Sequence, residues 1–274
     1  MKTLYVSDLD GTLLNEYAKL PPETIGIINN LVNNGMLFTY ATARSFSSAS
    51  VVTSGLDLRL PVAVLNGAYL VEPKTGEIKE TVSFTKSERD FIVDTLIEHG
   101  HNPLVFACED GKERVFWEAS KESFGVLNFL ASRQGDMRLC PVDSKKELKV
   151  GETVNILVIS ESEEIGVLAN LFHNKGFLCY FQRDIYNQDE YWLEVFPENT
   201  GKGEAVKKLK ELTRADKVIC FGDGLNDIEM FEFCDESYAT ANAAQAIKNI
   251  ATGIIGKSGD NAVAKWLLEN VKME

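Results

Sequence analysis

Two acidic residues near the start of the sequence, Asp8 and Asp10, have a spacing that suits metal or acid–base chemistry. Residues 4–7 before them are apolar enough for a buried strand, and Gly11 after them marks a turn. Residues i and i+2 lie on the same side of a strand, so the two charges converge unless a cation lies between them or one acid keeps its proton. Grouped carboxylate oxygens suit Mg²⁺, which leaves room for substrate phosphate. The pair indicates a magnesium site, and the alternative is a plain strand end with an Asp-Gly turn.

Three further groups of polar residues follow predicted strands or begin predicted helices. They are Thr42 with Arg44, Lys202, and Asp223 with Asn226 and Asp227. Ligands bind at the carboxyl ends of the strands in an open parallel sheet, so we expect these residues to meet at one edge. Taken singly, Thr42 would be a strand-end hydroxyl, Lys202 a solvated charge and Asp227 a favourable acid in the first turn of a helix.

The segments that must position these residues alternate between strands and helices. The first strands are predicted at residues 4–7, 36–40 and 62–65, with one helix over 21–34 and another after Ser45. After Pro197 the expected elements are a helix at 201–212, a strand at 218–221, a helix to 233, short strands near 238 and 254, and a last helix at 261–271. This alternation predicts an α/β fold with a parallel sheet.

The middle of the sequence has a different pattern. After a hairpin around residues 73–76, we expect helices at 86–99, 121–133 and 162–174 and strands near 104–107, 114–117, 154–160, 177–182 and 191–196. Neighbouring strands without a helix between them predict an antiparallel sheet carrying helices, an α+β unit. We therefore predict a discontinuous core domain of residues 1–83 and 190–274 and an inserted domain of residues 84–189.

The composition is that of a globular protein with an excess of acidic residues. The 274 residues carry a net charge of −13, which argues against nucleic acid and anionic membranes as partners. An anionic substrate would then need a local source of positive charge. The five cysteines form no Cys-x-x-Cys pair, and no apolar run reaches the length of a membrane span. We therefore expect a cytoplasmic protein with reduced thiols.

Four motifs in this order resemble those of the haloacid dehalogenase superfamily and, within it, the Cof-type phosphatases of subclass IIB. The opening motif is Asp8-Leu9-Asp10-Gly11-Thr12-Leu13, Thr42 matches the second, Lys202 the third, and Gly222-Asp223-Gly224-Leu225-Asn226-Asp227 the last; Asn66-Gly67-Ala68 also fits. The resemblance spans essentially the whole chain and implies a Rossmann-like parallel-sheet core with an inserted α+β cap domain. Two residues depart from the pattern: Ala43, where the subclass commonly has Gly, and Thr240, where it often has Met.

The resemblance implies a distinct role for each of these residues. Asp8 is the expected nucleophile, which forms an aspartyl-phosphate, and Asp10 is the expected general acid and then base. Asp8, the backbone carbonyl of Asp10 and Asp223 would hold Mg²⁺, and Asp227 would hold metal-bound water. The residues expected to bind the phosphoryl group are Thr42, Lys202 and Asn226. Arg44 is expected either to bind substrate or to pair with an acid.

These roles predict a Mg²⁺-dependent phosphatase that hydrolyses a small phosphorylated metabolite, such as a sugar phosphate, and works as a monomer or homodimer. One alternative is a phosphomutase of the same subclass. Another is a signalling receiver domain, or a catalytically silent protein that binds a phosphate ligand. A receiver domain has no reason to carry Asp10 or a large cap.

The cap is expected to close over the site and to select the substrate. Candidate residues are Arg183, Tyr186 and Tyr191, which flank a polar connection between two cap strands and could equally belong to a surface loop. His99 and His101 are expected to be a surface pair at a helix end rather than a metal site, because no further ligands lie near them in the sequence.

Overall fold

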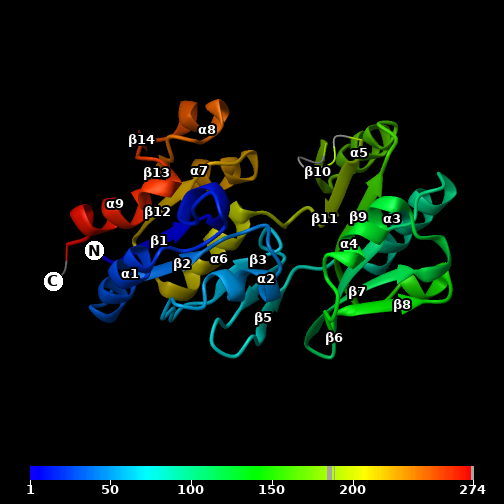
Figure 1. The fold of residues 1–274 in the computed structure, drawn as a ribbon, viewed down its shortest axis with the longest axis horizontal. Coiled ribbons are helices and arrows are strands. Elements are labelled where there is room, and N and C mark those ends of the chain that lie inside the picture. The colour runs from blue at the N-terminus through cyan, green and yellow to red at the C-terminus, as the bar shows by residue number, and fades with distance from the viewer. Residues whose placement is uncertain (184–186, 188, 273–274) are drawn as a thin grey trace. The chain divides into compact units, whose positions relative to one another are not determined.

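The structure is a computed structural model that describes residues 1–183, 187 and 189–272. The chain divides into two compact units (Figure 1). The core unit comprises Met1–Glu80 and Gly201–Glu274, and the inserted unit comprises Thr81–Thr200. The second boundary therefore lies at residue 200 rather than at 190, because Tyr191–Phe196 is a strand of the inserted unit's sheet.

A five-stranded parallel sheet forms the centre of the core unit. Its strands in spatial order are β14 (Gly253–Ile254), β13 (Glu236–Ala239), β12 (Lys217–Gly222), β1 (Thr3–Ser7) and β2 (Leu37–Tyr40). Val6 of β1 lies opposite Thr39 of β2 and Cys220 of β12. Strands covered on both faces are apolar along their whole length, which explains the continuous apolar runs in β1 and β12. The predicted α/β fold with a Rossmann-like sheet is confirmed.

Helices cover both faces of this sheet (Figure 1). Among them are α1 (Pro22–Asn33), α6 (Lys202–Thr213), α7 (Ile228–Phe233) and α9 (Ala262–Asn270), and the core unit also contains α2 (Phe46–Val52) and α8 (Gln245–Ile250). Successive residues of a strand point to opposite faces. Leu4 and Val6 accordingly share a buried cluster with residues of α6 and α7, whereas Tyr5 contacts Trp266 of α9. The short α8 was not among the predicted elements.

The third predicted strand belongs to a separate small sheet. β3 (Val62–Val64), β4 (Tyr69–Val71) and β5 (Ile78–Thr81) are neighbours in that order, and β3 pairs antiparallel with β4. A single parallel bridge, Ala41 to Ala63, links β3 to the end of β2. The hairpin around residues 73–76 therefore forms as predicted, but β3 does not extend the parallel sheet as a full strand.

The inserted unit is built on a six-stranded sheet. The spatial order is β10 (Leu178–Arg183), β11 (Tyr191–Phe196), β9 (Glu152–Ser160), β6 (Leu104–Glu109), β7 (Lys112–Glu118) and β8 (Leu139–Val142). All neighbours are antiparallel except β7 and β8. Asp110 and Gly111, at φ 51° and 72°, make the tight turn between β6 and β7. The unpredicted β8 is an edge strand containing Pro141, a residue that sheets tolerate at an edge.

The helices of the inserted unit are α3 (Lys86–Glu98), α4 (Phe124–Ala131) and α5 (Ile165–His173). Residues of α3 and α5 share a buried cluster with Val105 and Leu193 of the sheet. Phe129 of α4 contacts Phe106 and Trp192, which are adjacent to Val105 and Leu193 in the chain and so face the other side of the sheet. The predicted α+β composition is confirmed. No helix in the described ranges is both long and apolar enough to cross a membrane.

Candidate active site

The turn after β1 carries the first two acids of the site. The Asp8 N–H donates to the Phe221 carbonyl of β12 at 2.9 Å, and the chain then turns through Leu9–Leu13. Gly11 in this turn has φ 71°, and a Cβ atom there would lie 2.1 Å from Asp223 Oδ2. Only glycine therefore allows the turn to pass so close to the loop after β12.

A buried lysine connects the first acid to the last motif. Lys202 is the first residue of α6, and its Nζ donates to Asp8 Oδ1 and to Asp227 Oδ1, both at 2.6 Å. The exposed fractions are 1% for Lys202, 5% for Asp8 and 0% for Asp227. A buried charge is tolerated only with close partners. Lys202 thus supplies the local positive charge that the acidic composition demands.

Asp227 also organises the loop after β12. Its Oδ2 accepts hydrogen bonds from the N–H groups of Asp223 at 2.9 Å and Gly224 at 3.0 Å. Thr12, from the opening motif, donates its hydroxyl to Asp223 Oδ1 at 3.1 Å. The side chains of the first and last motifs are therefore joined directly, and both oxygens of Asp227 are occupied by donors.

The site holds more negative charge than Lys202 offsets. Burial raises the pKa of Asp8 to about 8; Lys202 opposes this shift, whereas Asp227 and Asp223 add to it. Burial, reinforced by Asp227, raises the pKa of Asp223 to about 6. Burial alone would lower the pKa of Lys202, but its pairing with Asp227 and Asp8 outweighs that effect and the net pKa is raised. Lys202 therefore keeps its proton, and the unfavourable crowding of negative charge appears in the raised pKa values of Asp8 and Asp223.

This carboxylate cluster fits a divalent cation. One oxygen from each of Asp8, Asp223 and Asp227 lies within 4.8 Å of the other two. Hard cations such as Mg²⁺ prefer oxygen ligands of this kind. A positive charge among the three acids would also lower the raised pKa values of Asp8 and Asp223. The cluster could therefore hold a divalent cation, and it contains Asp8 and Asp223 together with Asp227.

Asp10 has a different environment from Asp8. Arg44 holds its carboxylate in a two-pronged ion pair, with Nε on Oδ2 and Nη2 on Oδ1, both at 2.6 Å. Arg44 Nη1 also donates to Ser48 of α2 at 3.0 Å. The side chain of Asp10 is 52% exposed, so it can reach solvent or substrate. Of the two interactions anticipated for Arg44, the structure contains the pairing with an acid.

Thr42 and Asn226 lie at the carboxyl ends of β2 and β12. The Thr42 hydroxyl is buried and accepts the N–H of Arg44 at 3.2 Å. Asn226 Nδ2 donates to Asn66 Oδ1 at 3.1 Å. Asn66 is a buried residue with φ 52°, in the segment before the insertion that fits the family pattern. The residues predicted for catalysis and for metal or phosphate binding thus lie together in the core unit, whereas Arg183 and Tyr191 belong to the inserted unit.

The residues that anchor the Gly11 turn by hydrogen bonds to its carbonyl were not predicted from the sequence. Asn242 Nδ2 donates to the Gly11 carbonyl at 2.7 Å, and the Thr240 hydroxyl donates to the same oxygen at 3.2 Å. The departure from Met to Thr at position 240 therefore adds a hydrogen bond to the turn. The segment 238–243 was recognised as part of the family pattern, but a sequence alone does not show which carbonyl group an amide side chain will reach.

The residues considered in the inserted unit form only local contacts in the described part of the chain. His99 Nδ1 lies 2.8 Å from the Thr95 carbonyl at the end of α3. The Arg183 guanidinium lies over the ring of Tyr191, 5.2 Å from its centroid. Tyr186 lies outside the described residues. The described part of the chain shows no metal cluster that includes His99 or His101.

Comparison with known proteins gives the same family as the motifs. Residues 5–267 match the sequence model of the haloacid dehalogenase-like hydrolases. The chain is 23% identical to the 5-amino-6-(5-phospho-D-ribitylamino)uracil phosphatase YitU of Bacillus subtilis, over 97% of this chain and 96% of that protein. It is 25% identical to an HMP-PP phosphatase of Serratia proteamaculans, over 97% and 94%.

Solved structures share the fold along the whole chain. A crystal structure of a Thermotoga maritima protein superposes with a TM-score of 0.81 at 21% identity, covering 100% of this chain and 99% of that one. A subclass IIB sugar phosphatase of the haloacid dehalogenase superfamily superposes with a TM-score of 0.72 at 20% identity, covering 98% of each chain. The chain therefore belongs to the haloacid dehalogenase-like hydrolases, and this prediction is confirmed. The phosphatases among its relatives agree with the predicted class of phosphoric monoester hydrolase.

Proposed function

We propose that the chain is a Mg²⁺-dependent phosphatase that hydrolyses a small phosphorylated metabolite, of the sugar phosphate class, through an aspartyl-phosphate on Asp8. The observation that carries this proposal is the buried ion network in which Lys202 bridges Asp8 and Asp227 beside Asp223. Phosphoryl transfer needs positioned charge more than covalent machinery. The two curated relatives described above are named for phosphorylated small molecules, which supports the substrate class.

In the first half of the reaction, an oxygen of Asp8 attacks phosphorus and the bond from phosphorus to the leaving oxygen breaks. Lys202 occupies Asp8 Oδ1, so it fixes the orientation of the carboxylate. Asp10 gives a proton to the leaving oxygen, which departs as an alcohol. Thr42, Lys202 and Asn226 bind the oxygens of the phosphoryl group during the transfer.

In the second half, water attacks the phosphorus of the aspartyl-phosphate and loses a proton to Asp10. The bond from phosphorus to the Asp8 oxygen breaks, which releases inorganic phosphate and restores both acids. Asp8, the Asp10 carbonyl and Asp223 would hold Mg²⁺, with Asp227 supporting its water, and the bound ion supplies positive charge against the phosphoryl oxygens.

Arg44 is a positioning residue for Asp10 in this scheme. Its two hydrogen bonds engage both oxygens of the Asp10 carboxylate, so Arg44 fixes the orientation of this group and affects how readily it takes up and donates a proton. Arg44→Ala should therefore change the pH profile of kcat for poor leaving groups more than that for aryl phosphates. Arg44→Lys, which keeps the charge but loses the planar fork, should restore only part of the profile.

The proposal extends to the organisation of the protein. We assign the core unit as the catalytic domain and the inserted unit, Thr81–Thr200, as the cap that selects the substrate. The five cysteines are all free, which supports a reducing, cytoplasmic location. A monomer or homodimer is the expected state, and sedimentation velocity would test it.

The direct test is phosphate release from a panel of sugar phosphates and an aryl phosphate by the purified chain. Activity should require Mg²⁺, disappear with a chelator and return when Mg²⁺ is added again. Isomerised sugar phosphate without free phosphate would favour the phosphomutase instead. Absence of turnover with every ester, including the aryl phosphate, would favour a silent phosphate-binding protein.

A further inference from the structure

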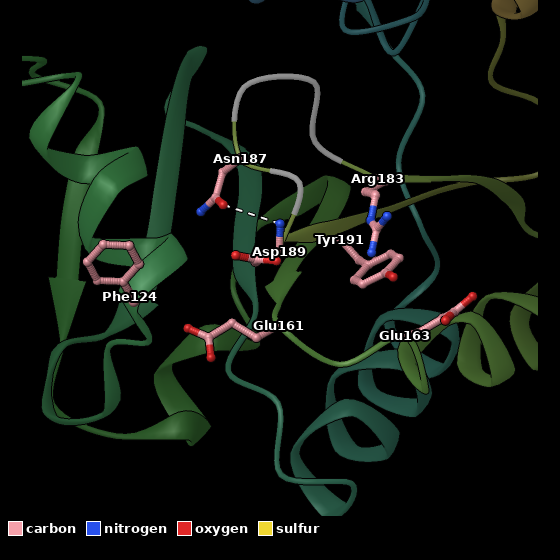
Figure 2. A pocket seen from close by; sticks show the side chains of 7 residues that line it. All are labelled: Phe124, Glu161, Glu163, Arg183, Asn187, Asp189 and Tyr191. Atoms are coloured by element: carbon pink, nitrogen blue, oxygen red, sulfur yellow. Dashed lines mark hydrogen bonds between the residues drawn. The ribbon is translucent and has the colours of Figure 1, made fainter.

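A pocket of about 450 Å³ lies in the inserted unit at the amino end of α4. Its walls come from the segment after α3, the start of α4, the end of β9 and the residue before β11. A neighbouring pocket, drawn in Figure 2, shares the lining residues Phe124 and Glu161 with it, and we call the two pockets together the trough. None of the residues assigned to catalysis lies in this unit.

Glu190 is the feature of this pocket that needs explanation. Its side chain is only 5% exposed, and its Oε1 has no hydrogen-bond partner among the described residues. A buried acceptor left without a donor costs about 1–3 kcal/mol. A native structure retains such a group where something else supplies the donor.

Gly125 shows that the backbone makes room for this carboxyl group. A Cβ atom on Gly125, the second residue of α4, would lie 2.2 Å from Ile159 Cγ2 and 3.3 Å from Glu190 Cδ. Any larger residue would push against β9 and crowd Glu190. The acidic group is therefore packed against the first turn of the helix and into the pocket wall rather than extended into solvent.

Three serine hydroxyls complement Glu190 around the pocket. Ser123 accepts the N–H of Val126, Ser160 accepts that of Ser162, and Ser162 accepts that of Glu164. Each hydroxyl oxygen accepts one hydrogen bond in this way, and its O–H can still donate. The pocket therefore presents hydroxyl donors together with a carboxylate acceptor, which is a pattern that suits a ligand with both hydroxyls and donor-rich groups.

The charge of the trough indicates the sign of the ligand. Glu161 and Glu190 line the first pocket, and Glu163 and Asp189 line the second (Figure 2). The cation among the described lining residues, Arg183, lies over the Tyr191 ring. Burial and the nearby His99 lower the pKa of His101, so that ring adds no positive charge at neutral pH. A phosphate or carboxylate ligand would be repelled here.

A metal ion does not fit these acids. Among the described residues, no three acids of the trough place their oxygens within 4.8 Å of one another, as Asp8, Asp223 and Asp227 do. The acids are distributed between the two pockets rather than gathered around one point, so they suit an organic ligand that carries an amine better than a metal ion. Phe124, 60% exposed at the junction of the two pockets, offers a ring face for the apolar side of such a ligand.

We propose that this pocket binds an amine carried on a hydroxylated group, of the amino sugar class, with its ammonium on Glu190 and its hydroxyls on the serines. The ammonium supplies the donor that Glu190 lacks, and the pair forms a charge-assisted hydrogen bond. The inference stands on the inserted unit alone and holds whether or not the core unit is a phosphatase.

The test is calorimetric titration of the full chain with D-glucosamine and D-glucose at neutral pH. The two probes differ only in an amine and a hydroxyl at one carbon. Glucosamine should bind about 10-fold or more tightly than glucose, because a hydrogen bond to a charged group contributes about 1.5–3 kcal/mol. Equal affinities, or no binding of either probe, would overturn the proposal.

Variants assign the binding to the pocket. Glu190→Gln keeps the shape and removes the charge, so it should weaken glucosamine binding about 10-fold or more. Phe124→Ala, at an exposed position that the fold does not need, should weaken both sugars. Glu152→Gln, an exposed acid at the start of β9, is the control for overall charge and should change neither. Binding of glucosamine that survives both Glu190→Gln and Phe124→Ala would place it elsewhere and contradict the proposal.

Measurements of turnover distinguish two possible sources of the amine, the substrate itself and a separate free ligand. If the amine belongs to the substrate's leaving group, Glu190→Gln should lower kcat/KM for glucosamine 6-phosphate and leave that for glucose 6-phosphate unchanged. If the amine is a free ligand, both esters should turn over as in the unmodified chain while glucosamine still binds through Glu190. A chain without phosphatase activity that still binds glucosamine through Glu190 would refute the proposed function and keep this inference.

Discussion

The acidic site of the core unit and the acidic pocket of the inserted unit differ in whether their buried carboxylates have hydrogen-bond donors. In the core unit, Lys202 contacts two buried acids, and both oxygens of Asp227 already have donors. In the inserted unit, Glu190 is as buried as Asp8, yet its Oε1 has no donor among the described residues. A site that performs chemistry on a phosphoryl group must be preorganised. A site that recognises a ligand can leave a partner to be supplied by that ligand.

The largest effect should come from the nucleophile of the preorganised site. Asp8→Asn keeps the shape of the side chain and its contact with Lys202 but removes the attacking carboxylate. We expect kcat to fall on the order of 10⁶-fold, as for other enzymes that lose a nucleophile. Circular dichroism and phosphate release would be measured together. A folded variant that retains turnover within about 10-fold of the unmodified chain would break the assignment of Asp8.

Asp10 should show a smaller effect that depends on the leaving group. Asp10→Asn removes the proton donor, which is worth about 10²–10⁴-fold for general acid catalysis. Sugar phosphates have leaving groups that need the proton, whereas aryl phosphates depart without it, so the loss should be concentrated in the sugar phosphates. The measurement is kcat for both classes in one buffer. Equal losses would show that Asp10 has another role.

Lys202 tests how much the buried ion network contributes to stability. Lys202→Met leaves two buried acids without their cation, and breaking a buried pair in this way costs about 3–5 kcal/mol in the free energy of unfolding. The control is Lys207→Met in the same helix, because Lys207 pairs with Glu204 at the surface. That pair should contribute only about 0–1 kcal/mol. Urea denaturation of both variants would decide, and equal losses would show that the network is not specially stabilising.

The sheet of the inserted unit allows a pH test without any ligand. Burial raises the pKa of Glu194 from 4.5 to about 7, and the hydrogen bond from Asn155 only partly opposes this shift. Between these pH values the unfolded chain loses a proton that the folded chain retains, so the free energy of unfolding falls as pH rises from 4.5 to about 7. The loss amounts to about 2–3 kcal/mol for a side chain that is partly accessible.

Glu194→Gln should remove that pH dependence. The variant cannot ionise, so its urea midpoint should change less between pH 4.5 and 7 than that of the unmodified chain. A difference of less than about 0.5 kcal/mol between the two pH profiles would show that Glu194 is hydrated in the folded protein. That outcome would also weaken the comparison between the two units, because it would show that a carboxylate of the inserted sheet has water as a partner despite its burial.

Sequence reasoning went furthest where chain pattern and chemistry coincide. The alternation of buried runs and helices predicts the parallel sheet, and parallel strands necessarily bring Asp8, Thr42 and Asp223 to one edge. The hairpin of β4 and β5 was predicted, but its pairing with β3 was not, because one apolar run fits a parallel or an antiparallel neighbour equally well. The boundary at residue 200 was missed for a similar reason, since β11 is recognisable as a strand but its partners are not.

The pairings between side chains were the part of the site that was hardest to predict from the sequence. The choice of Arg44 between substrate and an acid depends on a two-pronged approach to Asp10 that spacing along the chain does not encode. Asn242 reaches the Gly11 carbonyl across a sequence separation of 231 residues. Glu190 could not be singled out from other acids, because its significance comes from a missing partner in a folded pocket.

The most direct test of the central claim is to trap the phosphoryl group on Asp8. Asp10→Asn should still form the aspartyl-phosphate from an aryl phosphate, whose leaving group needs no proton, but should hydrolyse it slowly because the base is missing. Acid quenching followed by peptide mass spectrometry should then find the phosphoryl group on the peptide that contains Asp8, and Asp8→Asn combined with Asp10→Asn should lack it. Rapid release of phosphate with no labelled peptide, or a label on another residue, would contradict the account.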